Sequence, residues 1–361
     1  MRITRLDAQV LRLPQARSVS LPMSGEAKDK ARPTYIALIV HVETDAGFSG
    51  VGFGAYAISG RALLAAIEDE LSPLLVGEDL SCHERLWAKV QTRDNPLAIS
   101  AYSAIDIAIW DIKAKQAGAP LWQMLGGVRE RVPIHAAETA CPYLSATDTI
   151  TIARSCLTQG LGGVRVAVRG VDPEADAHKV QEIRDALGED IWFAVTGPGN
   201  YDYETALPMG RFIEEDVGAD WFEDPLHDDD IVGYARLSAR IDTPLAAGSG
   251  FTRTEQFLRL LDSGATVILR PDVLRLGGIT PWLKIAALAE LRRRPVVPYL
   301  LPEIGVHLAC ALPGVQAVEY IPWLAPLFSS QLQIENSQAI PPNRPGHGWE
   351  LNPEAVSKFR M

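Results

Sequence analysis

Hydrophobic and polar positions follow two different patterns along the chain. The pattern changes near residue 131 and divides the chain into two parts. Before that point, an alternating β-rich stretch at 34–43 leads into turn glycines, and helical spacing follows at 60–71, 82–91 and 99–117. After it, short apolar runs alternate with helical segments of about 10 to 15 residues. A period of two predicts strands, and apolar residues three and four apart predict helices. The first third is therefore predicted to be α+β, and the rest repeated βα units.

The part of the chain after residue 131 contains eight candidate strands. They lie at 132–137, 163–168, 191–196, 220–223, 243–247, 266–270, 295–299 and 315–319. Eight parallel strands separated by helices are typical of a closed barrel, which needs roughly 250 residues. A chain of 361 residues has room for such a barrel and a second module.

Turn and capping residues mark the ends of the helices that separate these strands. Asp172 followed by Pro173 predicts an N-cap and a first helical turn, and Gly188 predicts the end of the same helix. Thr280 and Pro281 repeat this arrangement further along the chain. We expect the apolar stripes of these helices to pack against the barrel and to carry no chemistry.

Composition and charge narrow the range of partners. Hydrophobic residues make up 47% of the chain and charged residues 22%, as in an ordinary globular protein. The formal charge of -11 opposes binding to a phosphate backbone, so nucleic acid is not an expected partner. We find neither an apolar run typical of a secretory signal nor one of about 20 residues that would span a membrane. A cytoplasmic protein with a small-molecule ligand is predicted.

The four cysteines and the glycine-rich stretch at 50–54 predict no chemistry. Cys82, Cys141, Cys156 and Cys310 are far apart in sequence and form no CxxC pair, so we expect reduced thiols. The glycines follow a hairpin turn and do not open a crossover helix, which argues against a phosphate-binding loop.

The candidate site consists of the residues at the ends of the predicted barrel strands. In a parallel barrel, inward side chains at the C-terminal strand ends form the active site. Two cations, three carboxylates, a phenol and two hydroxyls occupy these positions: Arg165, Thr196, Glu223, Ser249, Arg270, Asp272, Tyr299 and Glu319. Charges gathered in one partly buried cleft shift one another's pKa, which favours a functional interpretation of the set.

Several phrases of the sequence resemble the mandelate racemase and muconate lactonizing branch of the enolase superfamily. They are IVHVETDAGFSGVGFG, SAIDIAIWDIKAKQAGAPLWQMLGG, WFEDP, PLAAG, RPDVLRLGGITPWLKIAALAE and PPNRPGHGWELNP, and they span nearly the whole chain. The resemblance implies an α/β fold with a modified (β/α)8 TIM-type barrel. It places an α+β capping domain at 1–130, the barrel at 131–321 and a C-terminal segment at 322–361 that returns to the capping domain. It also implies a homo-oligomer, either a dimer or an octamer.

Members of this family remove the proton α to a carboxylate and stabilise the enediolate on Mg²⁺. The resemblance places three carboxylate ligands on successive strands, and the matching positions here hold Thr196, Glu223 and Ser249. One carboxylate with two neutral hydroxyls supplies little charge to hold Mg²⁺, although weak binding together with substrate oxygens stays open. We therefore expect no cofactor.

The family's two bases are replaced as well. A KxK phrase ends the second strand in the family, and Arg165 and Ala167 stand in its place. Tyr299 stands where a histidine usually pairs with the aspartate that is retained as Asp272. A phenol acts as a base only when nearby cations lower its pKa, and Arg165 and Arg270 are the candidates to do so. Arginine itself has too high a pKa to act as a base.

Three interpretations stay open. The first is a metal-independent lyase, isomerase or cyclase in which Arg165 and Arg270 hold an anionic or carbonyl-containing substrate. In it, Tyr299 and Asp272 move the proton, Glu223 orients an arginine, and Glu319 donates a proton to a substrate oxygen. The second is a non-catalytic homologue that binds a ligand or a protein partner. The third is a Mg²⁺-dependent acid-sugar dehydratase or racemase.

Overall fold

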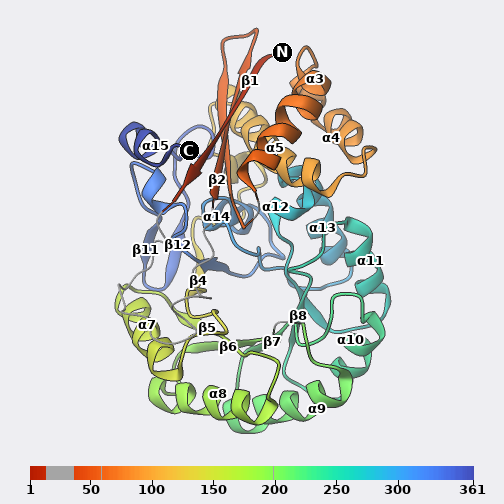
Figure 1. Cartoon of the computed structure of the whole chain (residues 1–361), viewed down its shortest axis with the longest axis vertical. Coiled ribbons are helices and arrows are strands. Elements are labelled where there is room, and N and C mark those ends of the chain that lie inside the picture. Colours follow the sequence, from red (N-terminus) through yellow and green to blue (C-terminus); the bar gives the residue numbers. More distant parts are fainter. Residues whose placement is uncertain (14–35, 58, 198) are drawn as a thin grey trace.

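The chain folds into two regions that share one long axis. The computed structural model describes residues 1–13, 36–57, 59–197 and 199–361. A three-stranded sheet with its helices forms one end of the molecule, and a barrel of strands ringed by helices forms the other (Figure 1). The predicted α/β class, with a capping domain and a modified barrel, is confirmed.

The sheet of the first region is an antiparallel meander in the order β1-β2-β3. Its strands are β1 (Ile3–Arg12), β2 (Ile36–Thr44) and β3 (Ser49–Tyr56). The hairpin expected from 34–43 and the glycines after it is confirmed from Ile36 onward, and residues 34 and 35 lie outside the described part of the chain.

Glycines in β3 allow the longest helix to lie directly on the sheet. A Cβ at Gly52 would come within 1.7 Å of the carbonyl oxygen of Ala104, and one at Gly50 within 2.3 Å of that of Ala108. Both carbonyls belong to α5 (Pro96–Gln116). The glycine-rich stretch therefore serves close packing of helix and sheet.

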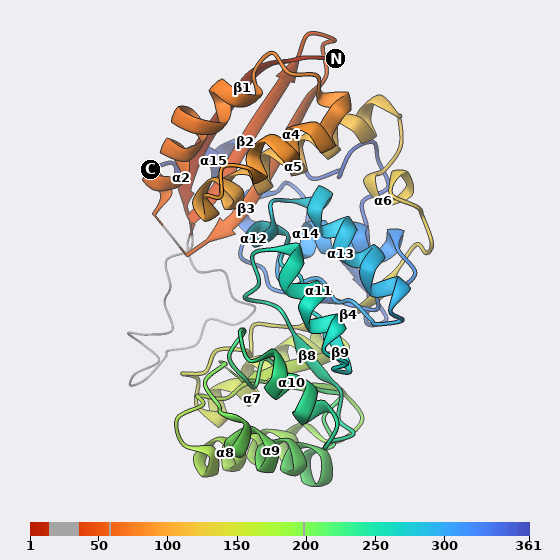
Figure 2. The same cartoon turned by 90° about the vertical axis from the view of Figure 1, so that its right-hand side faces the viewer.

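The helices beside this sheet cover one of its faces (Figure 2). They are α2 (Gly60–Ala65), η1 (Ala66–Leu71), α3 (Ser72–Leu75), η2 (Leu80–Cys82), α4 (His83–Gln91) and α5. The short helix α6 (Leu121–Met124) follows α5 and lies away from the sheet. Helix α5 begins at Pro96, three residues before the predicted start. The side chain of Asn95 accepts hydrogen bonds from the backbone N–H groups of Leu97 and Ala98, which fixes this end.

The barrel strands run parallel to one another in chain order. They are β4 (Val132–Ala136), β5 (Gly163–Ala167), β6 (Trp192–Thr196), β7 (Trp221–Glu223), β8 (Leu245–Ala247), β9 (Val267–Leu269) and β10 (Val318–Tyr320). Pairing of β10 with β4 brings the last strand back to the first. The strand predicted at 295–299 is reduced to isolated bridges, in which Val296 joins Leu269 and Val315. Pro295 and Pro298 have no backbone N–H, which explains why a regular strand does not form there.

Helices lie outside the strands, as expected for βα units (Figure 1). They are α7 (Ala146–Thr158), α8 (Pro173–Leu187), α9 (Tyr203–Phe212), η3 (Ile213–Val217), α10 (Ile231–Ser238), α11 (Thr254–Asp262), α12 (Val273–Leu276), α13 (Ile279–Leu291) and α14 (Pro302–Ala311). Asp172 caps α8 and Gly188 ends it at φ +80°, as predicted. The predicted cap at Thr280 is wrong, because α13 begins at Ile279 after Gly278.

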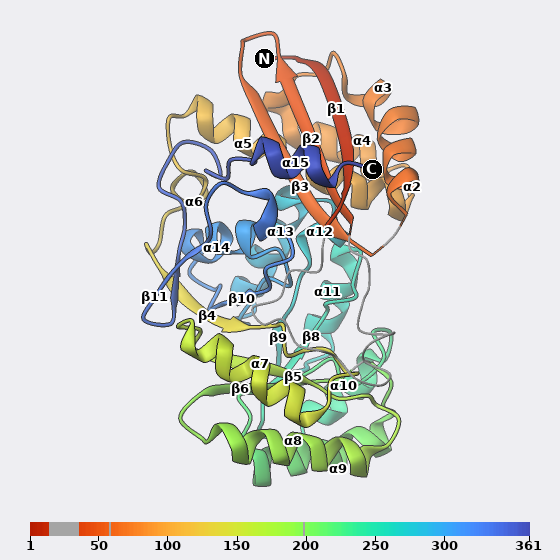
Figure 3. The same ribbon diagram turned by 60° about the vertical axis from the view of Figure 1, so that its left-hand side comes forward.

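The C-terminal segment touches both regions. It contains η4 (Ala325–Leu327), β11 (Gln333–Glu335), β12 (Gln338–Ile340) and α15 (Pro353–Phe359). Strand β12 pairs antiparallel with β4 of the barrel. At the end of the chain, the backbone N–H of Met361 donates to Val10 of β1 over 3.3 Å, and α15 lies beside that strand (Figure 3). The domain borders given above stay predictions.

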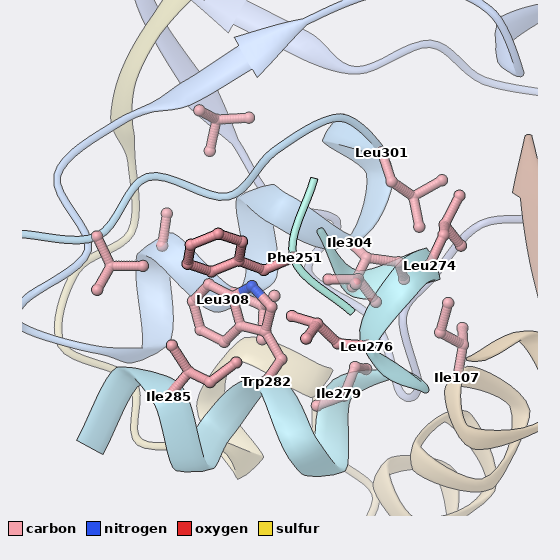
Figure 4. Close-up of a cluster of buried hydrophobic side chains, with 14 of the residues drawn as sticks. Ile107, Phe251, Leu274, Leu276, Ile279, Trp282, Ile285, Leu301, Ile304 and Leu308 are labelled. Atoms are coloured by element: carbon pink, nitrogen blue, oxygen red, sulfur yellow. The ribbon is translucent and has the colours of Figure 1, made fainter. Parts of the chain in front are cut away.

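A buried apolar cluster joins the two regions. Figure 4 shows Ile107 of α5 facing side chains of α12, α13 and α14. Trp282 of α13 is fully buried in this cluster. No helix in the described part of the chain is long and apolar enough to cross a membrane.

A polar contact lies beside this apolar junction. The carboxylate of Asp106 in α5 accepts hydrogen bonds from the backbone N–H of Thr280 over 2.8 Å and from its hydroxyl over 2.7 Å. Trp110 donates its indole N–H to the same hydroxyl over 2.9 Å. Thr280 thus connects α13 of the barrel to α5 of the first region.

Replacing Thr280 by valine tests this connection. The Thr280→Val variant keeps the side-chain shape but leaves buried polar atoms of Asp106 and Trp110 without the hydroxyl. We expect the free energy of unfolding to fall by about 1 to 3 kcal/mol, measured by urea denaturation. The matched control is Thr158→Val, at an exposed position on α7. Equal losses in the two variants would contradict the assigned role.

Candidate active site

Four charged side chains meet inside the barrel at its C-terminal end. Arg165 comes from β5, Glu223 ends β7, Arg270 follows β9 and Glu319 lies in β10. Each is at most 4% exposed. Successive side chains of a strand point to opposite faces of the sheet. The neighbours of these residues pack against the surrounding helices, so the four charged side chains point into the barrel. We call these four residues the charge cluster.

Each carboxylate of the charge cluster contacts both guanidinium groups. Arg165 donates from Nη1 to Glu223 Oε1, and its Nη2 lies 3.2 Å from Glu319 Oε2. Arg270 donates from Nη2 to the same Glu319 oxygen over 2.6 Å. Its Nε lies 3.2 Å from Glu223 Oε2 but is not aligned for a hydrogen bond. The expected convergence of these strand-end residues is therefore observed.

The charges of the cluster sum to zero, which permits its burial. Burial alone raises the pKa of Glu319, but Arg165 and Arg270 outweigh this effect and lower the pKa to about 2. For Arg165, burial favours loss of the proton, whereas Glu223 and Glu319 raise the pKa above its ordinary value. Arg165 and Glu319 are thus ionised at neutral pH, and each guanidinium group lies against both carboxylates.

Tyr299 lies over both guanidinium groups. The Cζ atoms of Arg165 and Arg270 are each 5.3 Å from the centre of its ring. Burial raises the pKa of this phenol, and the opposing effect of Arg165 does not overcome it. The two arginines therefore do not make Tyr299 a base, and its hydroxyl is available as a proton donor.

The chain near Tyr299 takes an uncommon backbone path. Leu300 and Leu301 both have positive φ, at 54° and 48°, which is unfavourable for residues with a branched side chain. In this conformation the backbone N–H of Leu300 donates to Glu319 Oε1 over 2.5 Å. The turn that follows Tyr299 is thus tied to the charge cluster.

Asp272 does not pair with Tyr299 through its side chain. Its carboxylate accepts from the backbone N–H of Leu274 over 2.8 Å and caps α12. Only the backbones of Asp272 and Tyr299 are joined, by a parallel bridge. Burial raises the pKa of Asp272 to about 6, which leaves it mostly ionised at neutral pH.

Thr196 ends β6, and Ser249 follows the end of β8 by two residues, in the expected places. The Thr196 hydroxyl donates to the backbone oxygen of Gly197 over 3.3 Å. The Ser249 hydroxyl donates to the carboxylate of Asp224. Neither hydroxyl forms a hydrogen bond with the charge cluster among the described residues.

Sequence reasoning missed three polar side chains at the site. Asp224 follows Glu223 in the phrase FEDP, has φ +40°, and has a pKa raised to about 7 by burial and by Glu223. Trp221 donates its indole N–H to Glu223 Oε2 over 3.2 Å. His135 stacks on Trp192 with ring centres 4.0 Å apart, and burial lowers its pKa to about 3. The two-residue spacing of Trp221 and Glu223 was a usable signal, since both face inward.

The described residues do not form a magnesium site of the three-carboxylate kind. Both oxygens of Glu223 already face guanidinium or indole N–H groups, and Thr196 and Ser249 bring no charge. No group of three or more His, Cys, Asp or Glu side chains in the described ranges is arranged to hold a metal ion.

The chain is similar to known proteins along nearly its whole length. Residues 9–126 match the family model described as mandelate racemase / muconate lactonizing enzyme, N-terminal domain, and residues 149–355 match that described as enolase C-terminal domain-like. An L-talarate/galactarate dehydratase of Salmonella typhimurium is 32% identical over 95% of this chain and 87% of its own. An arabinonate dehydratase of Saccharolobus solfataricus is 30% identical over 88% and 89%.

A similar solved structure contains a metal. It is an L-talarate dehydratase of Polaromonas complexed with Mg and L-glucarate, with a TM-score of 0.88 and 31% identity over 100% of this chain and 97% of that one. The expectation that this protein takes no cofactor is contradicted by this comparison, which points to Mg²⁺. The sequence prediction gave more weight to the missing carboxylates at Thr196 and Ser249 than to the use of Mg²⁺ in the family that the chain resembles.

The balance of charges in the cluster is open to a direct test. The Glu319→Gln variant keeps the shape of the side chain but leaves two guanidinium groups with one carboxylate. We expect a loss of about 3 to 5 kcal/mol in the free energy of unfolding near pH 7. The control is Glu189→Gln, at an exposed position.

The pH dependence of this loss follows from the lowered pKa of Glu319. In the unfolded chain this carboxyl titrates near its ordinary value of 4.5, and in the folded chain near 2. Its stabilising contribution is thus complete above about pH 4.5 and disappears as the pH falls toward 2. The difference between wild type and Glu319→Gln, measured by urea denaturation, should shrink over this interval. A pH-independent difference would contradict the ionised cluster.

Proposed function

Because the chain belongs to the mandelate racemase and muconate lactonizing branch of the enolase superfamily, we propose that it is a lyase that removes water from an acid sugar. The substrate class is a small polyhydroxylated carboxylate. In this reaction a carbon next to the carboxylate loses a proton and the neighbouring carbon loses a hydroxyl group. The cytoplasmic location and the homo-oligomer, a dimer or an octamer, belong to the same proposal.

One observation carries this proposal. A phenol lies over two guanidinium groups at the C-terminal strand ends of a barrel whose chain is about one-third identical to an acid-sugar dehydratase. This end of a (β/α) barrel is where active sites lie. The similarity of the chain to dehydratases favours elimination over isomerisation and cyclisation.

Tyr299 is the group we assign to the departing hydroxyl. Its pKa is raised, so the phenol keeps its proton at neutral pH. A neutral phenol is still a stronger acid than water and can protonate a leaving hydroxide. Asp272, ionised at neutral pH, is the proposed proton acceptor, and the backbone bridge to Tyr299 places it beside that residue.

The arginines are assigned to the substrate carboxylate. Arg165 Nε has no hydrogen-bond partner among the described residues, so a donor of this buried side chain is still available. Glu223 and Glu319 hold the two guanidinium planes in place. Paired in this way, the arginines supply directed N–H donors and no excess positive charge.

We include Mg²⁺ in the proposal because a similar solved dehydratase structure contains it. When bound, Mg²⁺ supplies positive charge that stabilises an enediolate. The described residues do not form a three-carboxylate site for it, so we assign no step to the metal. A metal held by so few protein ligands depends on oxygen atoms of the substrate for the rest of its coordination.

A panel of acid sugars tests the reaction. We expect the purified protein to dehydrate at least one aldarate or aldonate to a keto acid, detected as its semicarbazone. In the Tyr299→Phe variant we expect kcat to fall by about 10² to 10⁴ with little change in KM, because only the proton donor is lost. The matched control is Tyr203→Phe, at the start of α9, whose ring contacts Arg236 and no residue of the charge cluster in the described part of the chain.

Two results would count against the proposal. Full activity of Tyr299→Phe would remove the role assigned to the phenol. Ligand binding without turnover on the whole panel, with Mg²⁺ present, would support the alternative of a non-catalytic homologue.

Metal dependence is measured on the same reaction. We expect added Mg²⁺ to raise the rate with half-saturation in the millimolar range, and EDTA to reverse the effect. Without substrate, calorimetry should detect no tight binding, because Glu223 is the one carboxylate at the three usual positions. Tight binding of Mg²⁺ to the free protein would show that carboxylates rearrange around it, contrary to this expectation.

A further inference from the structure

A cavity opens at the end of the barrel opposite the candidate active site. It has a volume of about 490 Å³, within the range of roughly 300 to 1,000 Å³ that small-molecule sites occupy. Trp192 and Trp221, which line it, are the first residues of β6 and β7. Thr196 and Glu223, at the candidate active site, are the last residues of the same strands. We call this space the amino-end cavity.

The inner wall of the amino-end cavity is aromatic and aliphatic. The rings of Trp192 and Trp221 meet edge to face, with centres 4.4 Å apart and planes at 70°. Ile268, Val297 and Ala317 are among the other apolar residues of the lining. Trp221 is only 4% exposed, so the partly exposed indole of Trp192 supplies the aromatic surface of this wall, which favours a planar, apolar ligand.

The rim of the amino-end cavity carries a cation. Arg294 lines the cavity, and its guanidinium has no ion pair or hydrogen bond with any described residue. Asp220 also lines the cavity, but its carboxylate accepts the backbone N–H of Phe193 over 2.7 Å. The side chain of Arg294 is therefore available to an anionic group on a ligand, and its planar donors suit a carboxylate.

We propose that the amino-end cavity is a binding site for a planar aromatic carboxylate. The ring lies against the partly exposed indole of Trp192, and the carboxylate lies at the rim beside Arg294. This site is separate from the candidate active site and does not depend on the proposed dehydration, so binding is measured without any turnover.

Calorimetry with 2-naphthoate tests the proposal. We expect binding of one molecule per chain with a sub-millimolar Kd. Arg294→Met removes the charge at a partly exposed position and should weaken binding about tenfold. Ala317→Phe places a ring in the cavity and should abolish binding. The control is Arg293→Met, at an exposed neighbour outside the lining.

Two further ligands separate the contributions of ring and charge. Naphthalene-2-methanol lacks the charge, and cyclohexanecarboxylate lacks the flat ring, so each should bind more weakly than 2-naphthoate. Tyr299→Phe, at the candidate active site, should bind 2-naphthoate like wild type. The proposal is overturned if 2-naphthoate gives no binding heat at millimolar concentration. It is equally overturned if Ala317→Phe binds like wild type, or if Tyr299→Phe removes binding.

Discussion

The compensation of charge inside the barrel is the constraint on which the rest of the site depends. Two guanidinium groups are almost completely removed from water, and this is tolerable only because two carboxylates accompany them. The four residues come from β5, β7, the end of β9 and β10, which lie around the barrel. Their pairing therefore fixes the strand ends relative to one another as well as the chemistry of the site.

A second polar contact performs a comparable task between the two regions. Asp106 of α5 accepts both donors of Thr280, beside an apolar junction built around Trp282 (Figure 4). Burial raises the pKa of Asp106 to about 7, so this carboxylate differs from the strongly ionised Glu319. The capping region is thus attached to the barrel by buried apolar contacts and by the hydrogen bonds of Asp106 with Thr280. The strand ends of the barrel, in contrast, are held together by ion pairs.

The sequence predicts the fold better than it predicts the state of the site. Alternation located seven barrel strands, but the segment at 295–299 forms only bridges, because its two prolines cannot donate hydrogen bonds. Strand-end positions identified all four residues of the charge cluster. Their charges neutralise one another because of distances across the barrel, and these distances cannot be derived from the spacing of residues along the chain. The same limit applies to Tyr299 and Asp272, whose side chains were expected to cooperate directly and instead face different partners.

Trp221 connects the two ends of the barrel through a single side chain. Its ring lines the amino-end cavity, while its N–H holds Glu223 at the opposite end. Phenylalanine would supply a ring without the donor, and histidine a donor without the width of an indole. A substitution at position 221 therefore alters both ends of the barrel at once, because this one side chain serves the cavity wall and the carboxylate of Glu223.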